Sequence, residues 1–169
     1  MATLTEVLVR YLRAQVAAGV QVVQLFDSWA GALSTTDYER AVLPWSRRIL
    51  DAVGGGVPRI HFATGNPALL PLLAAAPCEV VSVDWRVPLD EAWDRIGPER
   101  GIQGNLDPGA CLAPFDVAAA AARDVLRRAA GRPGHVFNLG HGVLPETDAD
   151  ILARLADLVR TETASVAVA

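Results

Sequence analysis

The sequence predicts an α/β fold in which about five strand-helix units follow a leading helix. The alternation of two kinds of segment along the chain supports this prediction. Short apolar segments alternate along the chain with longer segments whose apolar residues recur at helical spacing. Because tight turns cannot join parallel strands, this alternation indicates parallel strands connected by helices. The 169 residues are expected to form a single domain over 1–169, large enough to bury roughly 70 % of its unfolded surface.

The chain is expected to open on a helix. Thr3 and Glu6 have the spacing of a capping box, and apolar residues follow at helical period up to Gly19. The β-branched segment "VQVVQLFD" at 20–27 then predicts a strand. Residues 38–53 return to a helical pattern that ends at three consecutive glycines.

The two central units are shorter. Strands are predicted at 59–65 ("RIHFATG") and 79–85 ("EVVSVDW"). Each precedes a short helical segment, at 67–76 and 89–95 respectively.

The last two units repeat the pattern. A strand is predicted at 101–108, and Asp116 is expected to cap the alanine-rich helix after it. The final strand is expected at 135–140. Thr147 together with Asp150 is expected to cap the closing helix.

Two parallel architectures remain open on this pattern. A nucleotide-binding doubly wound sheet should carry a glycine-rich turn after its first strand, and "FDSWAG" at 26–31 lacks that spacing. A complete eight-fold barrel usually needs about 250 residues. The chain could therefore supply only part of a barrel.

Polar or glycine-rich residues follow every predicted strand, and in both architectures these positions lie on one face. They are Asp27, Ser28, Thr64 to Asn66, Asp84, Asn105, Asp107, Asn138 and His141. We therefore expect a ligand site on that face.

The candidates on that face differ in strength. Asn66 and Asp107 each precede a proline, which favours a role in turns. For Asp84 the turn and site interpretations are evenly balanced. Ser28 lacks a nucleophile-elbow motif, so a hydrogen-bonding role is expected for it. His141 is the strongest candidate, because its two glycine neighbours allow a sharp turn and the close approach of a bulky ligand.

The composition excludes several functions. The net charge of −4 leaves no basic footprint for nucleic acid, and no apolar run reaches the roughly 20 residues of a membrane span, so a cytoplasmic protein is expected. All 15 basic residues are arginines, which excludes Schiff-base and P-loop chemistry in this chain. Cys78 and Cys111 form no CxxC pair and are interpreted as buried hydrophobes.

Four ordered blocks resemble the carboxy-terminal half of the uroporphyrinogen decarboxylase family. The blocks are "LFDSWAG" (25–31), "VDWRVPLDEA" (83–92), "QGNLDP" (103–108) and "FNLGHGVLPETD" (137–148). The resemblance implies a partial TIM (β/α)₈ barrel. It also implies decarboxylation of the four acetate side chains of uroporphyrinogen III to give coproporphyrinogen III in haem biosynthesis, without metal or organic cofactor.

The resemblance also implies roles for individual residues. Ser28 and His141 match family residues that contact substrate carboxylates, His141 being expected to serve catalysis, and Phe26 matches an aromatic residue of the cleft wall. The family's propionate-binding arginines and its pyrrole-binding aspartate belong to the amino-terminal half. The chain alone is therefore expected to be inactive, as a fragment or as a split half, and its expected partner is a complementary amino-terminal half or a second copy.

Two alternatives stay open. One is a non-catalytic barrel remnant that acts as a binding or dimerisation module. The other is a corrinoid-linked zinc methyltransferase, which resembles this barrel and binds zinc through a His-x-Cys pair. Here His61 is followed by Phe62 and Ala63, so the required thiolate is missing. His61 is then expected to line a pocket or to be a hydrogen-bonded histidine at a strand end.

Overall fold

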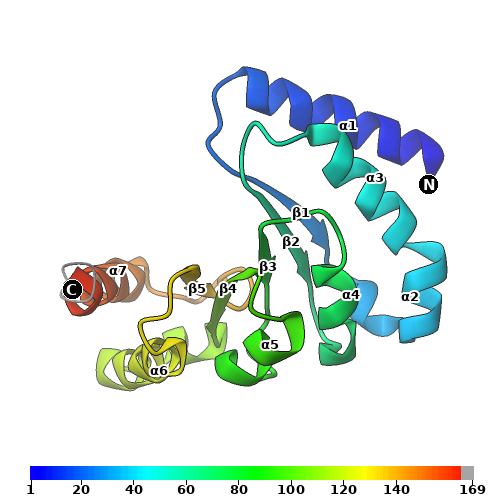
Figure 1. Cartoon of the computed structure of the whole chain (residues 1–169). Coiled ribbons are helices and arrows are strands. Elements are labelled where there is room, and N and C mark those ends of the chain that lie inside the picture. The colour runs from blue at the N-terminus through cyan, green and yellow to red at the C-terminus, as the bar shows by residue number, and fades with distance from the viewer. Residues whose placement is uncertain (165–169) are drawn as a thin grey trace.

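A computed structural model describes residues 1–164 and contains one sheet of five parallel strands (Figure 1). The strands lie side by side in chain order, and every neighbouring pair is parallel. They are β1 (Val23–Asp27), β2 (Arg59–Ala63), β3 (Val80–Ser82), β4 (Gly101–Leu106) and β5 (His135–Leu139). This arrangement confirms the predicted alternation of strands and helices.

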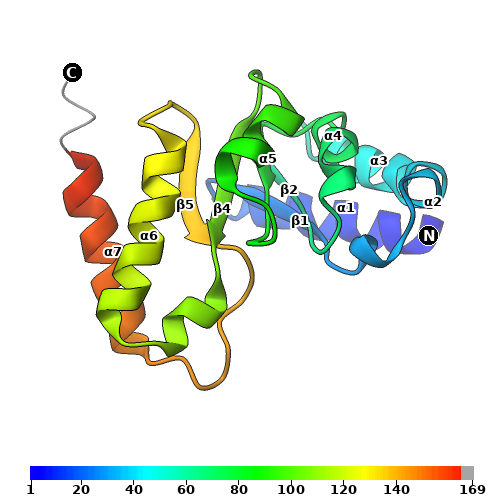
Figure 2. The same cartoon turned by 90° about the horizontal axis from the view of Figure 1, so that it is seen from below.

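The helices cover one face of the sheet. Because each connection advances by one strand in the same direction, crossovers of a single hand bring all the helices to the same side. The helices are α1 (Ala2–Ala17), α2 (Thr35–Ala41), α3 (Leu43–Val53), α4 (Leu70–Ala74), α5 (Leu89–Ile96), α6 (Phe115–Ala129) and α7 (Ala149–Ala164). Short 3₁₀ turns follow β1, β2 and β4. Both views show α1 to α3 at one end of an arc, with α6 and α7 at the other (Figures 1 and 2).

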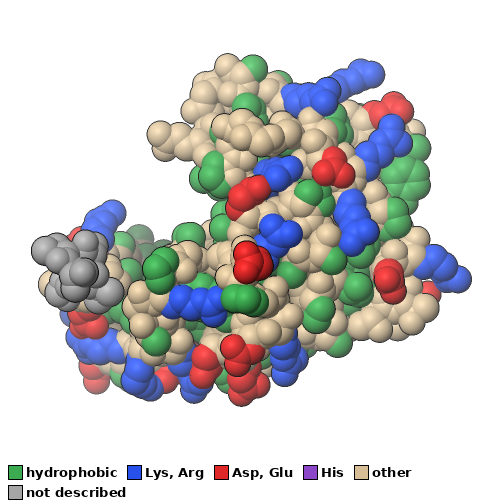
Figure 3. Space-filling view, viewed as in Figure 1, with side chains coloured by type: hydrophobic (Ala, Val, Ile, Leu, Met, Phe, Trp, Pro, Cys, Tyr) green, Lys and Arg blue, Asp and Glu red, His purple; other side chains and the backbone are tan. Residues whose placement is uncertain are grey.

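The sheet is not closed. In the described part of the chain, β1 and β5 each pair with one neighbour only and form the two edges. The result is part of a barrel, as expected. Its inner face is not covered by a helix, and the molecule is hollowed on that side (Figure 3).

The core lies between the sheet and the helices. The almost completely buried residues there include Val81 of β3, Val83 just after it, and Ile102 and Leu106 of β4. Burying each such aliphatic side chain stabilises the fold by about 1.5–3 kcal/mol. These packed strands hold the following loops in place.

The helix predicted at 38–53 is instead two helices. The first, α2, begins at Thr35, after Ser34, whose hydroxyl oxygen accepts the backbone N–H of Asp37 at 3.1 Å. The break falls at Val42, and Pro44 is the second residue of α3. Proline has no N–H, and its ring would clash with the carbonyl four residues earlier, so the helix cannot continue through it.

Two of the expected helix caps are wrong. The first helix begins at Ala2, so Thr3 lies inside its first turn, and no side chain caps it. The helix α6 begins at Phe115, so Asp116 lies in the first turn rather than at the cap. There its charge is favourable to the positive end of the helix dipole.

The third expected cap is also wrong. The helix α7 begins at Ala149, and Asp148 Oδ1 accepts the backbone N–H of Asp150 at 2.9 Å. The hydroxyl of Thr147 is buried and has no hydrogen-bond partner among the described residues. Asp148, rather than Thr147, therefore caps the start of α7.

Within residues 1–164, no helix has both the length and the apolar character needed to cross a membrane.

Candidate functional site

A cavity of about 410 Å³ lies on the uncovered face of the sheet, toward the carboxyl ends of the strands. It is lined by Gln24, Phe26, Ser28, Phe62, Ser82, Gln103, Asn138, Leu139, His141 and Gly142. We call it the strand-end cavity. Three residues predicted to belong to the site, Phe26, Ser28 and His141, thus line the same cavity, although more than a hundred residues separate Ser28 from His141.

Strand register explains why the lining residues meet. Phe26 of β1 pairs with Phe62 of β2, which pairs with Ser82 of β3, which in turn pairs with Gln103 of β4. Residues paired in parallel strands face the same side, and alternate residues of a strand face opposite sides. The uncovered face therefore presents these side chains as one row across the sheet.

The floor of the strand-end cavity is polar and internally bonded. The amide Nε2 of Gln103 donates to Gln24 Oε1 at 3.2 Å and to Ser82 Oγ at 3.0 Å. These three residues were not predicted from the sequence: Gln24 and Gln103 lie within strands, and Ser82 lies inside the strand predicted at 79–85, although β3 ends at it. Polar side chains inside otherwise apolar strands were the available signal for them.

One wall of the cavity is aromatic. The rings of Phe26 and Phe62 meet edge to face with centroids 5.6 Å apart, and Phe26 is 60 % exposed. The imidazole of His141 lies 6.3 Å from the ring of Phe62 and also 6.3 Å from that of Trp85. This wall offers apolar aromatic surface to a ligand.

Ser28 and His141 have unused polar groups. The backbone carbonyl of Ser28 accepts a hydrogen bond from the Thr64 hydroxyl, but its own hydroxyl has no partner among residues 1–164. Neither ring nitrogen of His141 has a hydrogen-bond partner within the same range, and the residue is exposed. Both groups are free to bind a ligand.

The predicted role of the glycines beside His141 is wrong in part. Neither Gly140 nor Gly142 has positive φ, so neither supplies a left-handed turn. A Cβ on Gly140 would lie 2.6 Å from the backbone nitrogen of Trp85. The absence of a side chain at Gly140 therefore lets the loop after β5 pack against the residues that follow β3. A Cβ on Gly142 would meet nothing within 4 Å, which leaves open space beside His141.

Other polar residues at the strand ends support the backbone. Asn66 Oδ1 accepts the N–H of Ala68, and Asp107 Oδ1 accepts that of Gly109, each at the start of a 3₁₀ turn. The turn interpretation of Asn66 and Asp107 is therefore confirmed. Asn105 is also structural, since its amide donates to the backbone carbonyls that follow β3.

Asp27 does not reach the strand-end cavity, contrary to expectation. Its carboxylate Oδ2 accepts hydrogen bonds from Tyr38 OH and Ser46 Oγ at 2.8 Å, and lies 2.9 Å from His61 Nε2. These partners belong to α2, α3 and β2, so the Asp27 cluster lies on the helical side of the sheet. His61 is fully buried, and its other ring nitrogen lies 3.4 Å from the carbonyl of Leu73.

Opposing effects set the protonation of the Asp27 cluster. Burial alone would raise the pKa of Asp27, but the hydrogen bond and charge of His61, with the two hydroxyl donors, outweigh it and lower that pKa. Burial and the neighbouring carboxylate raise the pKa of Tyr38. The cluster therefore holds a charged Asp27 beside a protonated tyrosine.

The structure offers no support for a zinc site. Within residues 1–164, no three His, Cys, Asp or Glu side chains are grouped so that they could hold a metal ion. Cys78 and Cys111 are free and buried, as expected, and burial raises the pKa of Cys78 to about 11. Thiols in such surroundings stay protonated at neutral pH.

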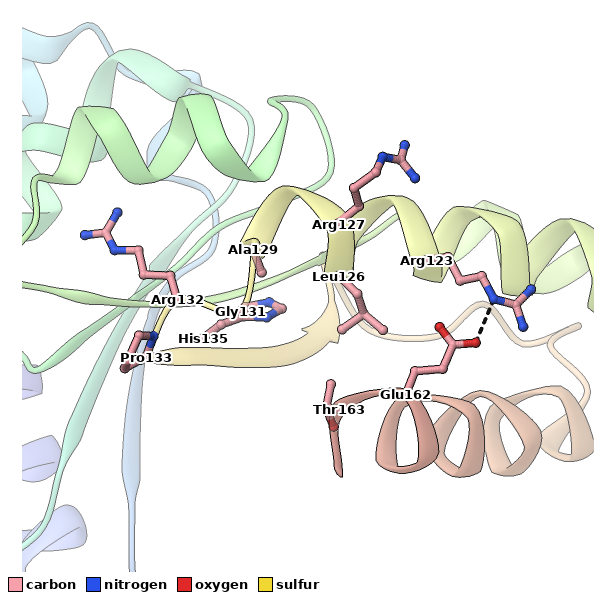
Figure 4. A pocket seen from close by; sticks show the side chains of 10 residues that line it. All are labelled: Arg123, Leu126, Arg127, Ala129, Gly131, Arg132, Pro133, His135, Glu162 and Thr163. Atoms are coloured by element: carbon pink, nitrogen blue, oxygen red, sulfur yellow. Dashed lines mark hydrogen bonds and ion pairs between the residues drawn. The ribbon is translucent and has the colours of Figure 1, made fainter. Parts of the chain in front are cut away.

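Another cavity, of about 600 Å³, lies elsewhere (Figure 4). It is bordered by α6, α7 and the start of β5, where Arg123 forms an ion pair with Glu162 at 2.7 Å. His135 lines it at the amino end of β5, whereas His141 follows the carboxyl end. In parallel α/β folds, ligands bind at the carboxyl ends of strands, which favours the strand-end cavity instead.

Comparisons with known proteins identify the family of this chain. The sequence model of the family described as Uroporphyrinogen decarboxylase (URO-D) matches residues 1–162. The chain is 57 % identical over 159 residues to a uroporphyrinogen decarboxylase of Frankia casuarinae, covering 94 % of this chain and 43 % of the relative. It is 56 % identical to that of Streptomyces coelicolor, covering 90 % and 43 % respectively. The chain thus spans less than half the length of these relatives.

A solved structure resembles the fold. A methyltransferase from Methanosarcina mazei superposes with a TM-score of 0.82 at 22 % identity, covering 94 % of this chain and 47 % of the other. At this identity the likeness extends to the fold alone.

Proposed function

Because the chain belongs to the uroporphyrinogen decarboxylase family, we propose that it is the carboxy-terminal half of a uroporphyrinogen decarboxylase and binds the tetrapyrrole in the strand-end cavity. The observation that carries the proposal is the meeting of Ser28 and His141 in one cavity beside an aromatic wall. Both groups are free to bind, and the substrate is a large macrocycle of four pyrrole rings rimmed with carboxylates.

The reaction removes carbon dioxide from each acetate side chain of uroporphyrinogen III. Protonation at a pyrrole carbon turns that ring into an electron sink. The bond between the acetate methylene and its carboxylate then breaks, carbon dioxide leaves, and the electron pair passes into the ring. A proton delivered to the methylene and the loss of the ring proton leave a methyl group. The pyrrole accepts the electrons, so this chemistry requires no metal or organic cofactor.

The residues of this chain bind and orient the substrate. The Ser28 hydroxyl and a ring N–H of His141 would donate to substrate carboxylates, where charge-assisted hydrogen bonds are stronger than neutral ones. Phe26 and Phe62 would pack against the macrocycle. The ring of His141, close to both Phe62 and Trp85, would be held between that wall and the carboxylate.

The proposed partner is a complementary amino-terminal half. The edges of the described sheet lie at β1 and β5, and the apolar side chains Val22, Phe26 and Val136 are 43–60 % exposed there. A second set of strands pairing with both edges would close the barrel and cover these side chains. The same partner would supply the pyrrole-binding aspartate and the propionate-binding arginines of the family.

Reconstitution tests the proposal. The amino-terminal part of the Frankia casuarinae relative, up to the point where the match to this chain begins, would be mixed with the chain, and coproporphyrinogen formation would be measured. We expect decarboxylation from the mixture and none from either half alone. A mixture that associates but yields no product would contradict the proposal and favour the non-catalytic remnant. Activity of the chain alone as a dimer would show that the partner is a second copy.

A further inference from the structure

The arginines of this chain are unevenly distributed. Among its 15 basic side chains, only Arg86 lies in a loop that follows the carboxyl end of a strand. The other arginines lie on helices or at the amino ends of strands. Within residues 1–164, Arg86 is thus the only permanent cation that follows the carboxyl end of a strand, the end of the sheet toward which the strand-end cavity lies.

Two neighbours hold the Arg86 guanidinium. Its Nη1 donates to Asp84 Oδ2 at 2.6 Å, and its Cζ lies 4.1 Å from the centroid of the Trp85 ring. Asp84 is itself fixed, since its carboxylate also accepts the backbone N–H groups of Gly65 at 2.7 Å and Arg86 at 3.0 Å, and it is only 5 % exposed. A planar cation placed between a carboxylate and an aromatic face has little freedom left to lose on binding.

The same contacts place Arg86 near the two proposed binding residues. Trp85 contacts both the guanidinium and the imidazole of His141, so one indole connects the two groups. Gly65, which shares the Asp84 carboxylate with Arg86, follows Thr64, whose hydroxyl donates to the backbone of Ser28. The loops after β1, β2, β3 and β5 are thereby joined around the mouth of the cavity.

Much of the guanidinium remains available. The Arg86 side chain is 47 % exposed, and apart from Nη1 none of its N–H groups has a hydrogen-bond partner in the described part of the chain. If the ion pair between Arg86 and Asp84 only stabilised the fold, it would not explain why this half-exposed cation lies at the ligand-binding end of the strands. We infer that Arg86 is a third binding residue of the site, which uses its free N–H groups to hold a substrate carboxylate. The inference rests on the proposed function.

Substitution in the reconstituted enzyme tests this inference. Arg86→Gln should raise KM for uroporphyrinogen about tenfold to a hundredfold, the range of one charge-assisted hydrogen bond, with little change in kcat. Arg95→Gln is the matched control, because Arg95 is similarly exposed at 44 % but lies on α5, paired with Glu91. KM of the unsubstituted enzyme should rise with added salt more steeply than KM of Arg86→Gln, since the substitution removes a charge pair that salt screens.

The outcomes separate the two proposals. If the unsubstituted pair decarboxylates and Arg86→Gln has the same KM and salt dependence as Arg95→Gln, the inference is wrong and the proposed function stands. If the unsubstituted pair neither binds nor decarboxylates uroporphyrinogen, both fail. Should Arg86→Gln not assemble, Arg86→Lys decides. Lysine keeps the charge but loses the planar fork, so a raised KM supports the inference and an unchanged KM overturns it.

Discussion

The carboxylate of Asp27 receives three side-chain contacts behind the sheet, while the next residue, Ser28, lines the strand-end cavity in front of it. Adjacent residues at a strand end point to opposite sides. The Asp27 cluster therefore anchors the end of β1 and, with it, the position of Ser28.

Replacing this carboxylate should weaken the fold. Asp27→Asn retains the shape but makes the acceptor neutral, so the hydrogen bonds from Tyr38 and Ser46 are no longer charge-assisted and the attraction to His61 is lost. We therefore expect a loss of about 1–3 kcal/mol in unfolding free energy at pH 7. Urea unfolding measures it. Asp94→Asn, at an exposed position of α5, is the control and should leave stability unchanged.

The loss should also depend on pH. The folded state lowers the pKa of Asp27, so the stability it contributes is complete above the ordinary aspartate pKa of about 3.9 and is lost as pH falls through the lower folded value. The difference between the unsubstituted chain and Asp27→Asn should therefore be constant above about pH 4 and shrink below it. A difference that grows on acidification would contradict this account of the cluster.

Single residues could be assigned from sequence only in part. Ser28 and His141 were predicted because they follow strands and match family motifs, and both line the strand-end cavity. Gln24 and Gln103 were missed because their contribution depends on register across strands distant in sequence. Asp27 was misplaced because strand-end position alone does not say which side of the sheet a side chain faces.

At the scale of elements, the loop after β5 depends on close backbone packing. Gly140 lies against the backbone of Asp84 and Trp85, which brings His141 next to the aromatic wall. From the sequence, the loop after β5 was predicted to belong to the ligand site, but its glycines were predicted to form a sharp turn. Contacts between loops of different units do not show in local sequence patterns.

A pair of glycine substitutions tests this packing. Gly140→Ala places a Cβ 2.6 Å from a backbone atom that cannot easily move, so we expect a loss of about 1–3 kcal/mol and a displaced His141. Gly142→Ala enters open space without positive φ and should leave the melting temperature unchanged. Equal melting temperatures for the two variants would show that Gly140 is not needed for close approach.

Secondary structure was predicted correctly from the sequence where local patterns of apolar residues determine it. All five strands were anticipated, as was the alternation with helices. The helix caps were predicted wrongly because each helix start depends on single hydrogen bonds to backbone N–H groups. The break at Val42 was missed because Pro44 interrupts a pattern of apolar residues that otherwise continues at helical spacing.

At the scale of the whole molecule, α1 presents an exposed apolar surface. Met1, Leu4, Val7 and Tyr11 are each 52–58 % exposed and recur at helical spacing, so they form one stripe along α1. In a complete barrel each helix packs against the next one. The proposed amino-terminal half would cover this stripe.

Charging the stripe should prevent assembly. Leu4→Glu combined with Val7→Glu would bury two carboxylates in the contact, so we expect association with the amino-terminal half to weaken at least tenfold. Sedimentation or calorimetry with the two purified halves measures it. Thr3→Glu, an exposed position beside the stripe, is the control. Unchanged affinity of the double variant would place the contact elsewhere.

The overall architecture could be reached from sequence only with the family resemblance. Alternating strands and helices left an open sheet and a barrel equally possible, and the ordered blocks decided between them. Local patterns do not contain the strand order, which the structure gives as sequential.

The most direct test of the binding site is steady-state decarboxylation by the reconstituted halves with Ser28→Ala and His141→Ala, singly and together. Each substitution removes a proposed donor to a substrate carboxylate, so each should lower kcat/KM by about tenfold or more while the thermal unfolding of the chain is unchanged. Product formation with undiminished rate and affinity in the double variant would contradict the claim that the strand-end cavity holds the substrate.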